Sequence, residues 1–152
     1  MKTKIFIFTA VCLFFVGCAS GPALRTVVNS FTINGDYDSI WSAVIETFAE
    51  LQIPIDNMEK DSGLITTDWI DFTGQTNEDY CDCGKLGINI EESRTGKFNA
   101  FLKKTSGNSC ELTMNCMFEQ IYFFGENRWK RKCVSTGNLE REMHERISAK
   151  LR

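Results

Sequence analysis

The chain has 152 residues, a formal net charge of −3 and an aromatic content of 12%. This length fits one compact domain of ordinary size and argues against a second one. The negative charge argues against nucleic acid as a partner, and the aromatic content argues against a disordered chain. The sequence has no Gly-rich phosphate loop, so we expect no nucleotide site. We also expect no cofactor and no bound metal.

Residues 1–17 have the layout of a secretory signal peptide. Two lysines precede an apolar run from Ile5 to Phe15, and Gly17 comes directly before Cys18. The apolar run is too short to span a bilayer, which needs about 20 residues. A small residue followed by cysteine resembles the lipobox of bacterial lipoproteins, where the cysteine is acylated and becomes the new N-terminus. The alternative is an ordinary signal peptide cleaved nearby, with Cys18 an incidental thiol.

The lipobox resemblance also implies a location. Ser20, rather than aspartate, stands two places after Cys18, which resembles lipoproteins sorted to the outer membrane and facing the periplasm. The membrane is then a partner through the lipid on Cys18. Residues 18–26 would form the lipidated cysteine and a short tether, and residues 27–152 a single domain. Loss of the two signal-peptide lysines would change the net charge from −3 to −5.

The first part of that domain has the pattern of a strand, a helix and a hairpin. Apolar residues up to Ile33 suggest a first strand, and Asp36 or Asp38 can cap the helix that follows. Apolar residues recur in this helix at three- and four-residue steps, so one face must pack against a sheet, and Pro54 ends the helix. Further strands are expected to begin at residues 53–55 and to run over residues 64–70.

The second part has the pattern of an antiparallel meander that ends in a helix. Residues 71–84 have no period and form a loop that is long for a compact domain. Strands are expected at residues 86–90, 98–102, 110–119 and 128–134, with a tight hairpin at Arg94–Gly96 between the first two. Apolar residues at four-residue steps from Leu139 to Leu151 predict a terminal amphipathic helix. The predicted fold class is α+β, with a strand and helix followed by five or six antiparallel strands and a C-terminal helix.

This order resembles the helix-grip arrangement, in which a curved antiparallel sheet wraps around a long C-terminal helix. Particular residues resemble those of the BamC-type lipoproteins of the outer-membrane β-barrel assembly machinery. They are Tyr37, Asp38 and Trp41 at the helix start, and Gly63, Ile65, Thr67 and Trp69 in the next hairpin. The resemblance implies a helix-grip fold and a role accessory to an envelope assembly complex.

Of the seven cysteines, Cys12 leaves with the signal peptide and Cys18 is assigned to lipid. In an oxidising compartment disulfides are the default expectation for the rest. Following strand direction through the meander places four of them at one end, so we expect two disulfides among Cys81, Cys83, Cys110 and Cys133. Cys83 with Cys133 is the preferred pair, and Cys116, in mid-strand, would be a buried thiol. A zinc site formed by the same four thiolates is the alternative.

No catalytic constellation is evident. His144 is the only histidine and lies on a charged helix, which disfavours Cys/His and Ser/His nucleophile systems. We therefore expect a non-enzymatic module that binds or scaffolds another envelope protein. The basic run Arg128–Lys132 would either touch lipid phosphates or an acidic partner, or be a solvated strand edge.

The alternative function is a carrier of a small apolar ligand or lipid, held in a cavity between sheet and helix. The side chains that would line such a cavity are Phe98, Leu102, Leu112, Met114, Phe118 and Leu139. The same side chains would equally form an ordinary hydrophobic core.

Overall fold

A computed structural model describes residues 20–72, 77–85, 92–105 and 107–152. The predicted signal peptide, Cys18 and the predicted strand at residues 86–90 lie outside the described residues. The elements in chain order are β1 (Ser30–Asn34), α2 (Tyr37–Glu50), β2 (Ile55–Glu59), β3 (Leu64–Thr67), β4 (Ile70–Asp71), α3 (Asn77–Tyr80), β5 (Cys81–Asp82), β6 (Glu92–Lys104), β7 (Ser109–Phe124), β8 (Asn127–Ser135) and α4 (Asn138–Lys150).

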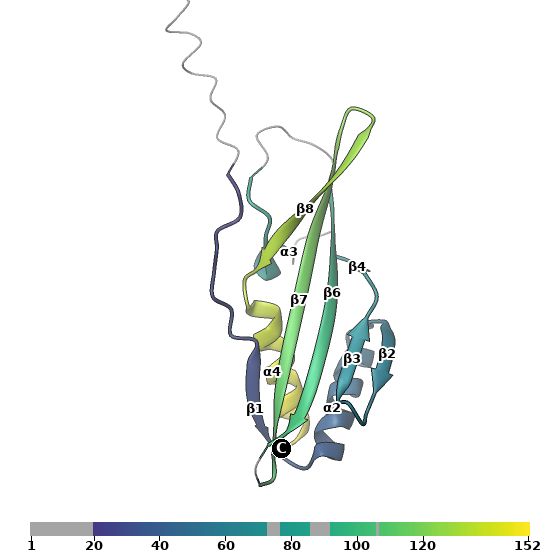
Figure 1. Cartoon of the computed structure of the whole chain (residues 1–152), viewed down its shortest axis with the longest axis vertical. Helices are drawn as coiled ribbons and strands as arrows, with labels where there is room; N and C mark the ends of the chain where they lie inside the picture. Colours follow the sequence, from purple (N-terminus) through teal and green to yellow (C-terminus); the bar gives the residue numbers. More distant parts are fainter. Residues whose placement is uncertain (1–19, 73–76, 86–91, 106) are drawn as a thin grey trace, which may run out of the picture.

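The strands form one antiparallel sheet in the order β2-β3-β6-β7-β8-β5 (Figure 1). The long strands β6 and β7 are its spine, and β7 has two successive neighbours on its far side. Its first part pairs with β1 and its last part with β8. The predicted α+β class, with an antiparallel sheet and a C-terminal helix, is confirmed. The eight strands of the described residues exceed the predicted number, because the short strands β4 and β5 also join the sheet.

The predicted tight hairpin at Arg94–Gly96 is wrong. Strand β6 runs straight through these residues, with Arg94 opposite Gln120 and Gly96 opposite Phe118. Gly96 makes room for aromatic rings rather than for a turn, because a Cβ there would lie 3.1 Å from Phe72 and 3.2 Å from Phe118. Without the hairpin, β6 carries the chain to the far end of the sheet before β7 begins. Strand β7 therefore runs in the direction opposite to the one predicted, and the cysteine near its start lies at the other end of the sheet.

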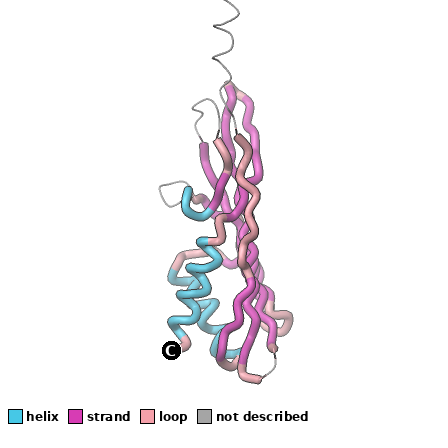
Figure 2. The backbone as a smooth tube through the Cα atoms, turned by 90° about the vertical axis from the view of Figure 1, so that its left-hand side faces the viewer, coloured by secondary structure: helices cyan, strands magenta, loops and turns pink. Residues whose placement is uncertain are grey.

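The helices α2 and α4 both lie on one face of the sheet (Figure 2). The backbone N–H of Ser39 donates to Asp36 Oδ1 at 2.9 Å, so Asp36 is the N-cap of α2. The predicted stripe of α4 is buried at Leu139, Met143 and Ile147. This stripe belongs to one buried cluster with the apolar face of α2 and with alternate side chains of β6 and β7.

Candidate functional site

Three cysteine sulfurs meet where β5 pairs with β8. Cys83 and Cys133 form a disulfide with an S–S distance of 2.00 Å, and this bond links residues that are 50 positions apart. The pairing is the one preferred from the sequence. Cys81 Sγ lies 3.8 Å from Cys83 Sγ. The disulfide therefore ties the segment that follows β5 to β8.

The second predicted disulfide is not formed. Cys110 lies near the start of β7, opposite Ile33 and Lys104, at the end of the sheet away from Cys81. The expected placement depended on the hairpin that β6 lacks, so Cys110 was assigned to the wrong end. Cys81, Cys110 and Cys116 all keep thiols.

Burial raises the pKa of all three thiols, and at Cys116 the neighbouring Glu140 raises the pKa further. Because the thiolate is the nucleophile, these cysteines are poorly suited to catalysis at neutral pH.

The four-cysteine zinc site is also ruled out by the position of Cys110. The sulfurs of Cys81, Cys83 and Cys133 lie within 4.8 Å of one another, but two of them are joined as a disulfide. A zinc site needs thiolates, usually with four ligands in structural sites. With the Cys83–Cys133 disulfide formed, the cluster is a structural crosslink.

The first described residues are held against this cluster. Ser20 forms a β-bridge with Lys85, and the backbone N–H of Ala23 donates to Asp82 Oδ2 at 3.1 Å. Arg25 lies 3.7 Å from the same carboxylate, and hydrogen bonds from the Gly84 and Ala23 backbone lower the pKa of Asp82. The described part of the predicted tether therefore lies along the domain.

The contacts between α3 and α4 are polar. Tyr80 Oη donates to Glu142 Oε2 at 2.6 Å, and Arg146 donates to Glu142 Oε1 at 2.8 Å. The hydrogen bond to Glu142, followed by burial, raises the pKa of Tyr80 to about 12. The same hydrogen bond, together with Arg146, lowers the pKa of Glu142. His144, on the same helix, stacks its ring on Phe31 with centroids 4.4 Å apart, which is a packing role.

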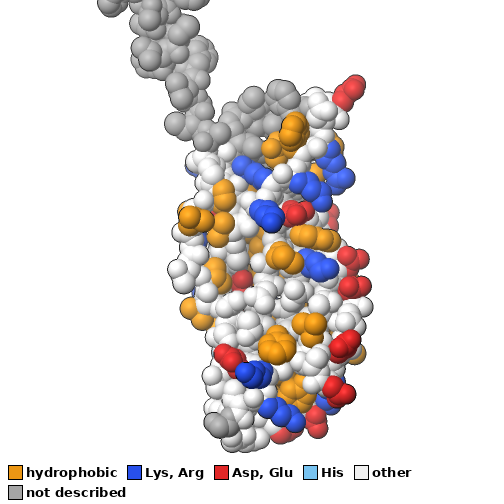
Figure 3. Space-filling model, viewed as in Figure 1, with side chains coloured by type: hydrophobic (Ala, Val, Ile, Leu, Met, Phe, Trp, Pro, Cys, Tyr) orange, Lys and Arg blue, Asp and Glu red, His pale blue; other side chains and the backbone are white. Residues whose placement is uncertain are grey.

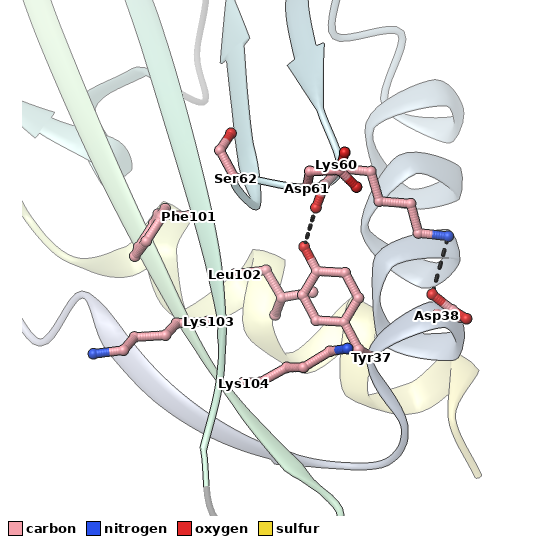
Figure 4. Close-up of a pocket in the computed structure, with 9 residues that line it drawn as sticks. All are labelled: Tyr37, Asp38, Lys60, Asp61, Ser62, Phe101, Leu102, Lys103 and Lys104. Carbon is pink, nitrogen blue, oxygen red and sulfur yellow. Dashed lines mark hydrogen bonds and ion pairs between the residues drawn. The ribbon is translucent and has the colours of Figure 1, made fainter.

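The residues that carry the BamC-type resemblance form one structural corner, shown in part in Figure 4. Tyr37 Oη donates to the carbonyl of Lys60 at 2.5 Å, and Lys60 Nζ lies 3.0 Å from Asp38 Oδ1. A cleft of about 470 Å³ lies beside these contacts. The corner fastens the start of α2 to the β2–β3 turn.

Gly63 and Thr67 complete the attachment of this hairpin to β6. The backbone N–H of Leu102 donates to the Gly63 carbonyl at 2.8 Å, and a Cβ on Gly63 would lie 2.0 Å from the Leu102 carbonyl oxygen. Thr67 Oγ1 accepts a hydrogen bond from the Phe98 N–H at 2.9 Å. Trp69, the last motif residue, is 42% exposed. Apart from Trp69 and Asp38, which are exposed, the motif residues have structural contacts within the domain.

The six side chains of the predicted ligand cavity lie together in the core. Each of them is at most 6% exposed: Phe98, Leu102, Leu112, Met114, Phe118 and Leu139. Phe98 and Phe118 meet Phe72 edge-on, with ring centroids 5.4 and 6.0 Å apart. These side chains pack on one another and on the helices, as core residues do.

The other side of the sheet is the candidate binding surface, which we call the open face. Within the described residues no helix covers it, and Figure 3 looks directly onto it. The central side chains of the open face are Lys97, Asn99, Phe101, Lys103, Thr113, Asn115 and Met117. Phe101 and Met117 are 40% and 46% exposed. The sequence indicated this face through the two strands predicted between residues 98 and 119. Apolar residues at every second position form one face of these strands, and the residues between them form the other.

No family model matches this sequence, and no curated protein is detectably similar to it. No helix in the described part of the chain is long and apolar enough to cross a membrane. Function is therefore inferred from the sequence features, the fold and these surfaces.

Proposed function

We propose that the protein is an exported lipoprotein, anchored through Cys18 at the periplasmic side of the outer membrane, that binds another envelope protein without catalysing a reaction. The observation that carries this proposal is the open face. Phe101 and Met117 expose large apolar surface on it among Lys97, Lys103 and neutral polar side chains. Apolar anchors in polar surroundings are the composition of non-obligate protein interfaces.

The disulfide supports the proposed location. Disulfides persist in oxidising compartments such as the bacterial periplasm and are rare where thiols are kept reduced. The Cys83–Cys133 bond thus agrees with export through the predicted signal peptide. The raised pKa values of the described thiols and the stacked His144 support a non-enzymatic role.

The same proposal includes a helix-grip relationship. In support of it, α4 lies along the sheet beside α2, and the motif residues Tyr37 and Gly63 hold α2 to the adjoining hairpin. An accessory role in envelope assembly follows from the BamC-type resemblance of those motif residues.

Crosslinking in intact cells tests the binding role. A photoreactive amino acid is placed at Phe101 or Met117 on the open face, and at Ser42, an exposed residue of α2, as the matched control. We expect discrete crosslinked envelope proteins from the first two positions and not from Ser42. Equal capture from Ser42, or none from the open face, would contradict the proposal.

Lipidation is tested separately. Cells grown with labelled palmitate should yield a labelled protein, and Cys18→Ala should lose the label and leave the membrane fraction. An unlabelled wild-type protein would exclude the anchor while leaving the crosslinking result interpretable.

A further inference from the structure

The hairpin formed by β7 and β8 extends past the helices at one end of the molecule (Figure 1). It carries large exposed rings near its tip, with Phe123 43% and Trp129 54% exposed. In the β7–β8 register Phe123 lies opposite Arg128, and Tyr122 lies opposite Trp129. Because neighbouring residues of a strand point to opposite faces, aromatic side chains stand on both faces of this hairpin.

The hairpin is also locally basic in a chain whose net charge is −3. Lys130 pairs with Glu119 at 3.2 Å, and Arg131 donates to Gln120 Oε1. Arg128 and Lys132 are exposed and have no ion-pair partner in the part of the chain that the structure describes. Lys and Arg side chains gather over this upper part of the open face in Figure 3.

Basic residues on an exposed strand also have a simpler explanation, because their charge discourages the strand from pairing with a strand of another chain. Preventing strand pairing requires charged side chains, whereas exposed aromatic rings on the same strand favour association with another chain. The combination of two exposed aromatic residues with two exposed basic residues instead has the composition that proteins use at a bilayer surface. Aromatic rings favour the headgroup level, and basic side chains are attracted to anionic lipids.

The described chain starts at this same end of the molecule (Figures 1 and 2). Ser20 is bridged to Lys85, and Cys83 in the same segment is bonded to Cys133 of β8. Cys18 precedes Ser20 by two residues, which is roughly 7 Å of fully extended chain. A lipid on Cys18 would therefore hold the hairpin end of the domain close to the bilayer.

We propose that the β7–β8 hairpin is a second membrane contact, in which Phe123 and Trp129 enter the headgroup region and Arg128 and Lys132 bind the phosphates of anionic lipids. The inference deepens the proposed function, since it uses the lipid on Cys18 to bring the hairpin to the membrane. Two separate contacts fix the orientation of the domain, so that the open face stands away from the bilayer plane and stays accessible to a partner.

Tryptophan quenching tests this contact on the lipoprotein as cells process it. The protein is reconstituted into vesicles of phosphatidylcholine, or of equal parts phosphatidylcholine and phosphatidylglycerol, with brominated acyl chains as the quencher. We expect quenching in the anionic vesicles that persists in Trp69→Phe and disappears in Trp129→Phe. High salt should reduce it, because salt screens attraction between exposed charges.

Charge reversal supplies the second variant and keeps Trp129 as the reporter. Each basic residue near an anionic surface is worth on the order of a fivefold change in partitioning. Arg128→Glu with Lys132→Glu should therefore lower the Trp129 contact at least about tenfold. Lys97→Glu with Lys103→Glu, two charges in the central part of the open face, is the matched control and should leave the quenching unchanged.

Unquenched Trp129 in anionic vesicles, with palmitate still on Cys18, overturns the hairpin contact and leaves the anchor standing. An equal loss in the control pair also overturns it, because the effect would then be one of net charge. Crosslinking of Trp129 to an acidic protein in cells, without quenching in vesicles, would assign the hairpin to a protein partner. If palmitate labelling fails while quenching occurs, the anchor is wrong and the hairpin contact is retained.

Discussion

The molecule has two parts that are held together by different forces. In the helix-backed part, α2 and α4 lie against one face of the sheet and bury side chains such as Phe48, Leu112 and Ile147. At the hairpin end, within the described residues, those helices no longer cover the sheet. Next to the hairpin, the Cys83–Cys133 disulfide and the contacts of Asp82 join segments that are far apart in the chain, and Tyr80 of α3 donates a hydrogen bond to Glu142 of α4.

The difference shows how a small domain extends a sheet beyond its core. Apolar burial stabilises by roughly 25 cal/mol per Å², so a strand that projects past its covering helices loses most of that contribution. A covalent bond and a few directed hydrogen bonds replace it. The extension can then keep aromatic and basic side chains exposed, as Trp129 and Arg128 are.

The largest expected effect comes from the helix-backed part. Phe98→Ala removes a ring that is 1% exposed and packed on Phe72 and Phe118, and should lower the free energy of unfolding by about 3–5 kcal/mol. Phe101→Ala, the same change on the open face of the same strand, removes a ring that is 40% exposed and should cost only about 1 kcal/mol. Chemical denaturation of both variants measures the difference. Similar losses would show that the open face is not solvent-exposed.

Loss of the disulfide should have the next largest effect. Cys83→Ser with Cys133→Ser removes a bond that closes a loop of 50 residues, and should lower the free energy of unfolding by about 2–4 kcal/mol. Hydrogen exchange should report the loss of protection first in β5 and β8. Cys116→Ser, at a position without a disulfide, is the control. Protection lost equally in α2 would mean that the two parts unfold as one.

Gly63 tests the corner that joins α2 to the sheet. Gly63 has φ +74°, and an added Cβ would lie 2.0 Å from the Leu102 carbonyl oxygen. Gly63→Ala should therefore cost about 2 kcal/mol from backbone strain and displacement of β6. Gly107 has a similar φ of +77° but open space around it, so Gly107→Ala isolates the strain and should cost about 1 kcal/mol. Thermal unfolding of the two variants measures the difference.

The smallest expected effect is the pH dependence of the contact between α3 and α4. The pKa of Glu142 is lowered, so its contribution is present above the ordinary carboxyl range and is lost as the pH falls through the depressed value. The pKa of Tyr80 is raised from 10.0 to about 12, so its contribution is lost as the pH rises through that interval. Thermal unfolding of wild type and Tyr80→Phe should differ by a few degrees near neutral pH and converge at both extremes. A constant difference at all pH values would contradict this coupling.

Local sequence patterns were sufficient to predict individual helices and strands, but not to predict how the strands connect. The cap at Asp36, the apolar stripe of α4 and the alternation in β7 are set by neighbouring residues, so a single sequence predicts them. Whether Arg94–Gly96 turns or continues depends on Phe72 and Phe118, which lie far away in the chain. That one error reversed the direction of β7 and sent Cys110 to the wrong end.

Parts of the candidate site could also be predicted from the sequence, where local patterns were sufficient. Cys83 and Cys133 were paired from strand direction, and the BamC-type residues indicated a folded corner. The contact of Asp82 with Ala23 and that of Tyr80 with Glu142 join segments about 60 residues apart. No local spacing specifies such contacts.

The attachment of Ser20 to the domain through its β-bridge with Lys85 has a mechanical consequence. A force applied at the membrane anchor would enter the domain through the Ser20–Lys85 bridge and the contacts of Ala23 and Arg25 with Asp82. The Cys83–Cys133 bond would then pass it covalently to β8, which is paired along β7, the longest strand. Tension on the anchor would thus load many inter-strand hydrogen bonds together, and the domain could resist pulling while its hairpin remains at the membrane.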